Sequence, residues 1–165
     1  MIGPREDFLT WDERWMADAV LASKRSKDPS TQVGACIVDN ENIPVSSGYN
    51  GFPKKISNSA LPWDRKGEPL DTKYMYMCHA EQNAIDNSNC NRERMSESKI
   101  YTTLYPCNEC AKRIIQTGIK EVIYLSDKYH DKDECVAARK MFELSGVKTR
   151  QLKINKTIVI ELKNE

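Results

Sequence analysis

A large net charge of either sign is the first thing that this sequence lacks. Its 165 residues carry 25 Lys and Arg against 24 Asp and Glu, so the formal net charge is +1. A protein that holds a long nucleic-acid backbone usually presents a strongly basic surface. The near balance therefore argues against nucleic acid as a partner and favours a small ligand with few phosphates.

Long apolar runs are also absent. No stretch approaches the ~20 consecutive apolar residues that a membrane-spanning helix needs. The first residues, MIGPREDFLTWDE, are acidic and polar, whereas a secretory signal peptide has a basic stretch followed by an apolar one. We therefore expect a soluble, cytoplasmic protein with no membrane partner.

Disulfide bonds are not expected, although the chain has six cysteines. A chain of this length buries roughly two thirds of its unfolded surface in one core, so we expect a single domain over residues 1–165 that needs no cross-links. Cys107 and Cys110 form a CxxC motif, which in a reduced protein is typical of metal binding. Cys36 and Cys135 fall within apolar patterns and are interpreted as core residues.

Hydrophobic periodicity and turn residues divide the chain into predicted elements. Strands are predicted at 33–39, 43–49, 99–104, 121–125 and 147–152, and helices at 11–25, 79–87, 107–117 and 133–145. A capping box at Thr10–Glu13 opens the first helix, and Gly118 and Gly146 follow two later helices, where C-cap glycines stand. The alternation of helix and strand predicts an α/β domain with helices on both faces of one sheet.

Two segments do not follow this alternation. Residues 51–77 contain prolines, glycines and scattered charges without clear periodicity, which predicts an ordered insertion; a loop of this length is usually functional. Residues 157–162 alternate β-branched side chains, a pattern that fits either an edge strand or a contact with another subunit.

Three candidate metal ligands stand at the start of predicted helices: His79 in His79-Ala80-Glu81, and Cys107 and Cys110 in PCNEC. Two cysteines three residues apart on one helical turn point the same way, and a helix N-terminus favours the thiolate that binds metal. Three protein ligands with an open fourth position are typical of a catalytic zinc. Glu81 would then lie beside the metal, where it can move protons.

HAE and PCNEC, separated by 24 residues, are similar to the motifs of the cytidine deaminase superfamily. The segments SKDPSTQVGACIV, GYNGFP, LPW, LDTKY, CHAEQNAI, PCNECAKRIIQTGIKEV and SDKYHD, in that order, resemble the deoxycytidylate deaminase family. The resemblance covers about residues 11–150. It implies a cytidine-deaminase-like three-layer fold with a five-stranded mixed sheet, and hydrolytic deamination of dCMP to dUMP and ammonia.

The resemblance also implies roles for single residues. Glu81 is expected to act as the proton carrier, and the backbone carbonyl of Ala80 to accept a hydrogen bond from the amino group of the base. Asn50 is expected at the 3′-hydroxyl of the sugar and Tyr129 beside the base. Arg25 is our candidate for the 5′-phosphate, because a guanidinium binds two oxygens at once.

Regulation and assembly are implied by the resemblance alone. Many family members are hexamers that dCTP with Mg²⁺ activates and dTTP inhibits, so we expect a homo-oligomer, with a hexamer favoured. The effector site is expected to involve Gly48, Asn50, Gly51 and Pro53. Some phage relatives hold a second, structural zinc, but this insertion has no histidine before His79, so one zinc per subunit is expected.

Several alternatives stay open at this point. A CxxC alone also fits a redox pair or a structural zinc, for which Cys78, Cys90 or His130 would have to supply a fourth ligand. Among deaminases, the substrate could instead be dCTP, a polynucleotide, a tRNA adenosine or free cytidine, although free-nucleoside enzymes generally have Cys in place of His79. A zinc domain that binds nucleotide without turnover is the non-enzymatic alternative, against which an intact Glu81 argues.

Overall fold

The computed structural model describes residues 2–163, and a five-stranded sheet lies at its centre. Its strands are β1 (Gly34–Val38), β2 (Pro44–Tyr49), β3 (Lys99–Leu104), β4 (Glu121–Ser126) and β5 (Lys148–Gln151). They lie in the order β2-β1-β3-β4-β5. β1 pairs antiparallel with β2 and with β3, whereas β3, β4 and β5 run parallel. The predicted mixed sheet is confirmed.

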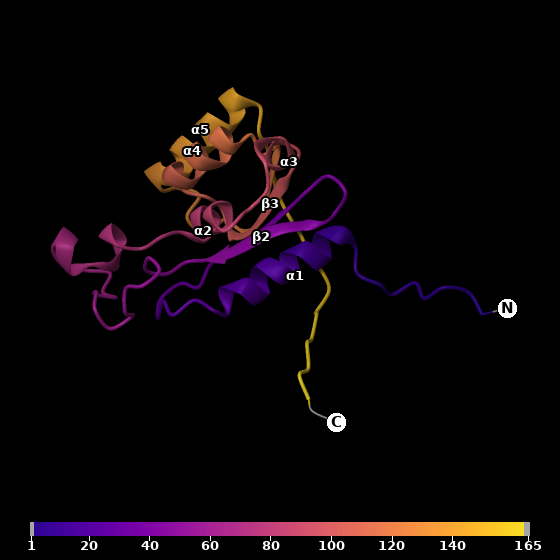
Figure 1. Cartoon of the computed structure of the whole chain (residues 1–165), viewed down its shortest axis with the longest axis horizontal. Coiled ribbons are helices and arrows are strands. Elements are labelled where there is room, and N and C mark those ends of the chain that lie inside the picture. Colours follow the sequence, from indigo (N-terminus) through magenta and orange to yellow (C-terminus); the bar gives the residue numbers. More distant parts are fainter. Residues whose placement is uncertain (1, 164–165) are drawn as a thin grey trace.

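Helices cover both faces of this sheet. They are α1 (Trp11–Ser23), α2 (Ala80–Asp86), α3 (Arg92–Ser96), α4 (Asn108–Thr117) and α5 (Asp133–Ser145). α1 lies along one face, and α2, α4 and α5 lie on the other (Figure 1). The predicted arrangement of helices on both faces, which makes three layers, is therefore also confirmed.

Two apolar cores, one on each face, hold the layers together. All five residues of β1 are buried because both of its faces are covered. Successive side chains of a strand point to opposite faces, so Ile37 packs under α2 while Val38 packs with Trp15 and Met16 of α1. Burying an apolar side chain of this size contributes ~1.5–3 kcal/mol. The buried sheet therefore holds the residues at its strand ends in fixed positions.

The first helix begins as predicted and ends two residues early. Thr10 Oγ1 accepts a hydrogen bond from the N–H of Glu13 at 3.3 Å, and Glu13 Oε2 accepts one from the N–H of Thr10 at 2.8 Å. After Ser23 the N–H groups of residues 24–26 each bond to the carbonyl three residues earlier. This tighter winding ends the α-helix before Arg25.

The remaining predicted elements differ from the observed ones by at most one residue at either end. Gly118 and Gly146 cap α4 and α5 with φ values of 84° and 75°, as expected of left-handed C-cap glycines. The short helix α3 was not predicted. It begins where Asn91 accepts a hydrogen bond from the N–H of Arg94 at 2.9 Å, and it is too short to show a helical period.

The segment between β2 and α2 contains only two single-turn 3₁₀ helices, Pro69–Asp71 and Lys73–Met75. Gly51 and Cys78 close its base with two backbone hydrogen bonds of 3.1 and 2.9 Å. Figure 1 shows this segment projecting to the left of the sheet, on the side away from the N-terminus.

The last described residues add no element. Within the described chain, residues 157–162 form no strand, so the edge-strand alternative is wrong, while the subunit contact stays a prediction. Ile154, just before them, packs half-buried against the core beside α1. None of the helices within residues 2–163 has both the length and the apolar character that crossing a membrane requires.

Candidate functional site

Two helix starts bring the three predicted metal ligands together. His79 is the N-cap residue of α2, Cys107 is the N-cap residue of α4, and Cys110 lies in the first turn of α4. The two helices stand side by side on the same face of the sheet. Each ligand therefore lies at the positive end of a helix, where a thiolate is stabilised.

The ligand atoms are spaced as a zinc ion requires. Nδ1 of His79 lies 3.3 Å from Sγ of Cys107 and 3.4 Å from Sγ of Cys110, and all three atoms lie within 4.8 Å of one another. Tetrahedral zinc, with bonds of about 2.0 Å to nitrogen and 2.3 Å to sulfur, would separate these atoms by about 3.5 Å. The donor set therefore fits zinc.

The group has three members. Within residues 2–163, neither Cys78, Cys90 nor His130 joins it as a fourth ligand. A structural zinc normally closes its coordination with four protein ligands, whereas a catalytic zinc keeps one position open. The arrangement therefore favours a catalytic site over a structural one.

The ligands also polarise one another. The hydrogen bond with Cys107 raises the pKa of His79 to about 9. The pKa of Cys107 is lowered to about 4, mainly by a hydrogen bond from Cys110; burial opposes this shift and a hydrogen bond from His79 adds to it. The pKa of Cys110 is raised well above its ordinary value by the hydrogen bond with Cys107 and by burial. Zinc binds thiolates and a neutral imidazole, so its binding here would be accompanied by the release of protons from this group.

Glu81 lies beside this group and not within it. Its side chain is buried, with Oε2 3.5 Å from Sγ of Cys110 and Oε1 3.4 Å from Oγ1 of Thr102. Burial raises the pKa of the Glu81 carboxyl. A carboxyl group with a raised pKa next to a metal site can accept a proton and return it near neutral pH. Thr102 was not singled out from the sequence, because a threonine in a buried strand carries no distinguishing pattern.

A pocket of about 620 Å³ opens above the metal ligands and is lined by residues of the sheet ends, the helix starts and the insertion. Its volume suits a small-molecule ligand. The predicted residues that line it include Asn50, Ala80 and Tyr129, beside His79 and Glu81. The structure thus brings most of the predicted site residues together.

Arg25 is not among them. It lies exposed in the turn after α1 and lines a second pocket of about 400 Å³, together with Asp18 and Ser46. Within the described residues, the cations that line the metal pocket are different ones, none of them predicted: Arg65, Lys73 and Lys132. Two of these come from the insertion, where the lack of a period hides the direction of each side chain.

Both the oxygen and the nitrogen of the Asn50 side-chain amide are hydrogen-bonded. Its Oδ1 accepts from the N–H of Val33 at 2.8 Å, and its Nδ2 donates to the Thr31 carbonyl at 2.9 Å and to Asp28 Oδ2 at 3.3 Å. These bonds hold the 28–33 loop as one wall of the pocket. The contact of Asn50 with a sugar stays a prediction.

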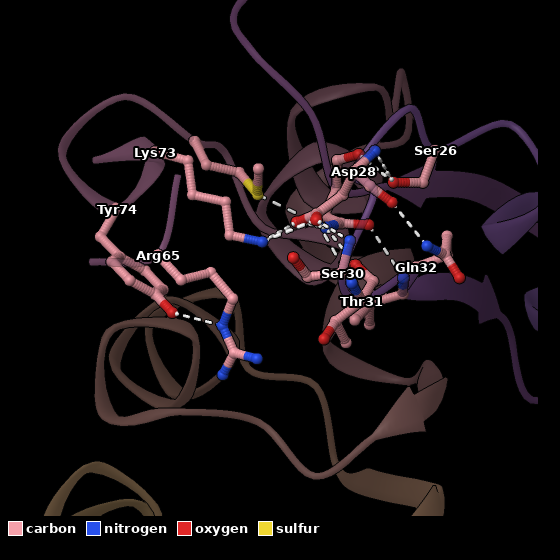
Figure 2. Close-up of polar contacts among 11 residues, drawn as sticks. Ser26, Asp28, Ser30, Thr31, Gln32, Arg65, Lys73 and Tyr74 are labelled. Carbon is pink, nitrogen blue, oxygen red and sulfur yellow. Dashed lines mark hydrogen bonds and ion pairs between the residues drawn. The ribbon is translucent and has the colours of Figure 1, made fainter. Parts of the chain in front are cut away.

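A buried ion pair fastens the insertion to that loop (Figure 2). Nζ of Lys73 lies 2.6 and 2.5 Å from the two carboxylate oxygens of Asp28, and the side chains are 5% and 1% exposed. Asp28 Oδ1 also accepts from the backbone N–H groups of Ser30 and Thr31. The pair was missed because its members stand 45 residues apart, which no local spacing reveals.

The candidate effector residues lie where the insertion begins. A Cβ on Gly48 would come within 2.3 Å of the Ala84 nitrogen and 2.4 Å of the Ala80 oxygen, so glycine lets α2 approach β2 closely. Gly51 pairs with Cys78, and Pro53 is exposed. Their part in effector binding stays a prediction, as does the hydrogen bond from a substrate to Ala80.

The loop after β4 places its two aromatic rings differently. Tyr129 is half-buried and lines the metal pocket, whereas His130 is exposed and does not line it. Nδ1 of His130 lies 3.3 Å from the Asp127 carbonyl oxygen. This contact gives His130 a structural partner outside the metal pocket.

Comparisons with known proteins agree with this geometry. The family model described as "Cytidine and deoxycytidylate deaminase zinc-binding region" matches residues 9–126. The chain is 56% identical to human deoxycytidylate deaminase over 148 residues, which cover 89% of this chain and 82% of the human protein. It is 51% identical to the probable deoxycytidylate deaminase of Drosophila melanogaster over 164 residues, covering 95% and 80% of the two chains.

Solved structures give the same result. The dCMP deaminase of cyanophage S-TIM5, in complex with dCMP and dUMP, is similar with a TM-score of 0.63 and 27% sequence identity. The alignment covers 85% of this chain and 95% of the phage chain.

Proposed function

The chain belongs to the zinc-binding family of cytidine and deoxycytidylate deaminases, and on that premise we propose that it hydrolyses dCMP to dUMP and ammonia. One observation carries the proposal: three metal ligands and the buried Glu81 carboxyl meet in one pocket. The similarity to human deoxycytidylate deaminase and to a phage enzyme solved with dCMP and dUMP supports the choice of substrate.

Zinc held by His79, Cys107 and Cys110 would supply the Lewis acidity that makes water a nucleophile at neutral pH. Glu81 takes a proton from the attacking water and delivers it to N3 of cytosine. Water adds to C4, the bond from C4 to the amino nitrogen breaks, and Glu81 passes the second proton to the leaving nitrogen. Ammonia departs and a carbonyl oxygen stays on C4, so atoms and charges balance.

The surroundings of Glu81 suit this role. Its burial next to Thr102 keeps bulk water from its carboxyl and holds Oε1 in one place. The fixed position lets one group serve both proton transfers without a change of partner. The pocket volume of about 620 Å³ is large enough for a mononucleotide.

The proposal extends to regulation and assembly. dCTP with Mg²⁺ activates the enzyme, dTTP inhibits it, and the functional form is a cytoplasmic homohexamer with one zinc per subunit. This part rests on the resemblance of the GYNGFP segment to the deoxycytidylate deaminase family, and the effector residues that we propose are Gly48, Asn50, Gly51 and Pro53. Initial rates with each effector, together with the mass in solution by light scattering, test it.

The direct test is the loss of cytosine absorbance for dCMP, dCTP, deoxycytidine and a cytosine-containing oligonucleotide with the zinc-loaded protein. We expect turnover of dCMP above the other three. Turnover of the oligonucleotide or the nucleoside without dCMP would move the chain to another branch of the superfamily. No turnover of any of the four would favour a domain that only binds nucleotide.

The role of Glu81 is tested with Glu81→Gln. This variant should keep its zinc and its affinity for dCMP while turnover falls by ~10³-fold or more, as expected when a general acid–base group is lost. Glu143→Gln, which changes an exposed carboxyl on α5 outside the pocket, is the matched control and should behave as wild type. Unchanged turnover in Glu81→Gln would refute the catalytic assignment.

A further inference from the structure

The metal pocket contains one guanidinium that the chain itself leaves mostly unused. Of the three cations that line the pocket, Lys73 is neutralised by its buried pair with Asp28. Arg65 donates from Nε to the hydroxyl of Tyr74 at 3.1 Å. Across residues 2–163, its two terminal nitrogens have neither a hydrogen bond nor an ion pair. A guanidinium held at one nitrogen and free at the other two is ready for a ligand.

One hydrogen bond, between Nε and the hydroxyl of Tyr74, orients this exposed guanidinium. Tyr74 holds Arg65 at Nε, and Tyr74 directly follows Lys73, which the buried carboxylate of Asp28 anchors. Figure 2 shows the two terminal nitrogens of Arg65 directed away from Tyr74. Because the side chain is held by a neighbour, less rotamer entropy is lost when it binds a ligand.

Arg65 lines the same pocket as Tyr129 and Asp28. Its hydrogen bond with Tyr74, followed by the charges of Tyr74, Tyr129 and Asp28, raises the pKa of Arg65. The hydrogen bond with Thr31, and then the nearby positive charges that include Arg65, lower the pKa of Tyr129. The groups that act on Arg65 thus belong to the insertion, the 28–33 loop and the loop after β4, and no metal ligand is among them.

The chemistry of the free nitrogens indicates the ligand. Two terminal guanidinium nitrogens match two oxygens of a phosphate in a bidentate contact, which is stronger and more directional than the contact of a lysine. Lys132 also lines the pocket, but its ammonium group offers a single point charge without the planar fork of a guanidinium. The pocket therefore has a metal-binding region at His79 and, at Arg65, a guanidinium whose two terminal nitrogens have no partner within residues 2–163.

We propose that Arg65 binds the 5′-phosphate of the substrate and sets the preference for the nucleotide over the nucleoside. This inference rests on the proposed deamination of dCMP, and it assigns the phosphate to the insertion instead of to Arg25. The insertion then has a definite role, because it supplies the residue that distinguishes dCMP from deoxycytidine.

The experiment compares dCMP with deoxycytidine as substrates of Arg65→Ala and Arg65→Lys. We expect Arg65→Ala to lower kcat/KM for dCMP by roughly 10- to 100-fold, mostly through KM, as the loss of charged hydrogen bonds predicts. kcat/KM for deoxycytidine should stay within about twofold. Arg65→Lys keeps the charge without the fork and should recover part of the loss for dCMP.

Lys66→Ala is the matched control, because Lys66 is a neighbouring exposed cation of the insertion that does not line the pocket. It should leave both substrates unchanged. If the Arg65 variants fold poorly, Tyr74→Phe provides a second measurement. It frees Nε of Arg65 without removing charge, and should raise KM for dCMP by a smaller factor while deoxycytidine is unaffected.

The result that overturns the inference is an equal loss on both substrates, or no loss on either. A dCMP-specific loss in Arg25→Ala or Lys132→Ala, with Arg65→Ala unchanged, would assign the phosphate elsewhere and also overturn it. Failure of the proposed function looks different, because the wild-type protein itself would then not turn over dCMP.

Discussion

The metal-binding region and the loop wall of the same pocket are built by different physical means. His79 and Cys107 stand at the starts of α2 and α4, which pack on a buried sheet. The opposite wall consists of the 28–33 loop and the insertion, which contain no regular element beyond two 3₁₀ turns within the described chain. Buried polar contacts of Asp28, Lys73 and Asn50 hold these two loops together.

This difference predicts different responses to mutation. Apolar packing is shared among many side chains, so a single substitution in the metal-binding region should abolish activity while the fold is retained. A buried ion pair depends on both members, because removing one leaves an uncompensated charge out of water. Changes in the metal-binding region should therefore appear in kcat and zinc content, and changes in the loop wall in KM and stability.

The largest effect is expected from removing a metal ligand. In Cys107→Ala the zinc site keeps two of its three protein ligands, so zinc content should fall from about one per chain to near zero. Turnover of dCMP should fall by ~10³-fold or more. Metal analysis of the purified protein and a dCMP assay measure both. Cys90→Ala, a cysteine outside the ligand group, is the control, and full zinc content in Cys107→Ala would contradict the site.

The loop wall should respond most to Lys73→Met. Asp28 then stays buried without its cation, although the N–H groups of Ser30 and Thr31 still donate to it. We expect a loss of about 2–4 kcal/mol in the free energy of unfolding, measured by urea titration, and a KM for dCMP raised by roughly tenfold or more.

Zinc content should not change in Lys73→Met. Lys66→Met is the control, since it removes an exposed lysine from the same insertion. Loss of zinc from Lys73→Met would show that the metal-binding region and the loop wall are not independent, and would remove the basis of the comparison.

Gly48→Ala tests how firmly α2 is seated. The added Cβ would lie 2.3 Å from the Ala84 nitrogen, a backbone atom that cannot rotate away. The helix must shift, at an expected cost of about 1–3 kcal/mol in the free energy of unfolding. Because His79 opens α2, the affinity for zinc should weaken as well. Gly51→Ala, where nothing lies within 4 Å of the added atom, should leave stability unchanged.

The sequence alone predicts the metal-binding region better than the loop wall. The ligands and Glu81 were predictable because HAE and PCxxC fix their relations within one helical turn each. The contact of Asp28 with Lys73 joins segments 45 residues apart, and the place of Arg65 depends on how the insertion docks. Local sequence therefore favours Arg25 for the phosphate, although Arg25 lines another pocket in the folded chain.

The fold divides in the same way. The sheet and its long helices were predicted to within two residues at each end, because their apolar periods extend over several turns or strand pairs. The prediction missed α3, which has five residues, and allowed a strand at 157–162 that is not formed there. β-branched alternation favours a strand only where a neighbouring strand offers free backbone groups, and the sequence does not show whether one does.

The smallest effect is expected from Thr102→Val, which tests whether Thr102 positions Glu81 or binds the substrate. Oγ1 of Thr102 contacts the Leu104 carbonyl at 3.0 Å and Glu81 Oε1 at 3.4 Å, and a hydroxyl has one hydrogen to share between them. Thr102→Val removes the hydroxyl group with little change of volume, so kcat should fall only ~2–10-fold while KM for dCMP stays constant.

Thr103→Val is the matched control, because Thr103 points to the other face of β3, where its hydroxyl accepts a hydrogen bond from the N–H of Gly34 at 3.1 Å. It should lower stability by about 1 kcal/mol and leave kcat unchanged. A rise in KM without a change in kcat for Thr102→Val would instead place Thr102 with the groups that bind the substrate.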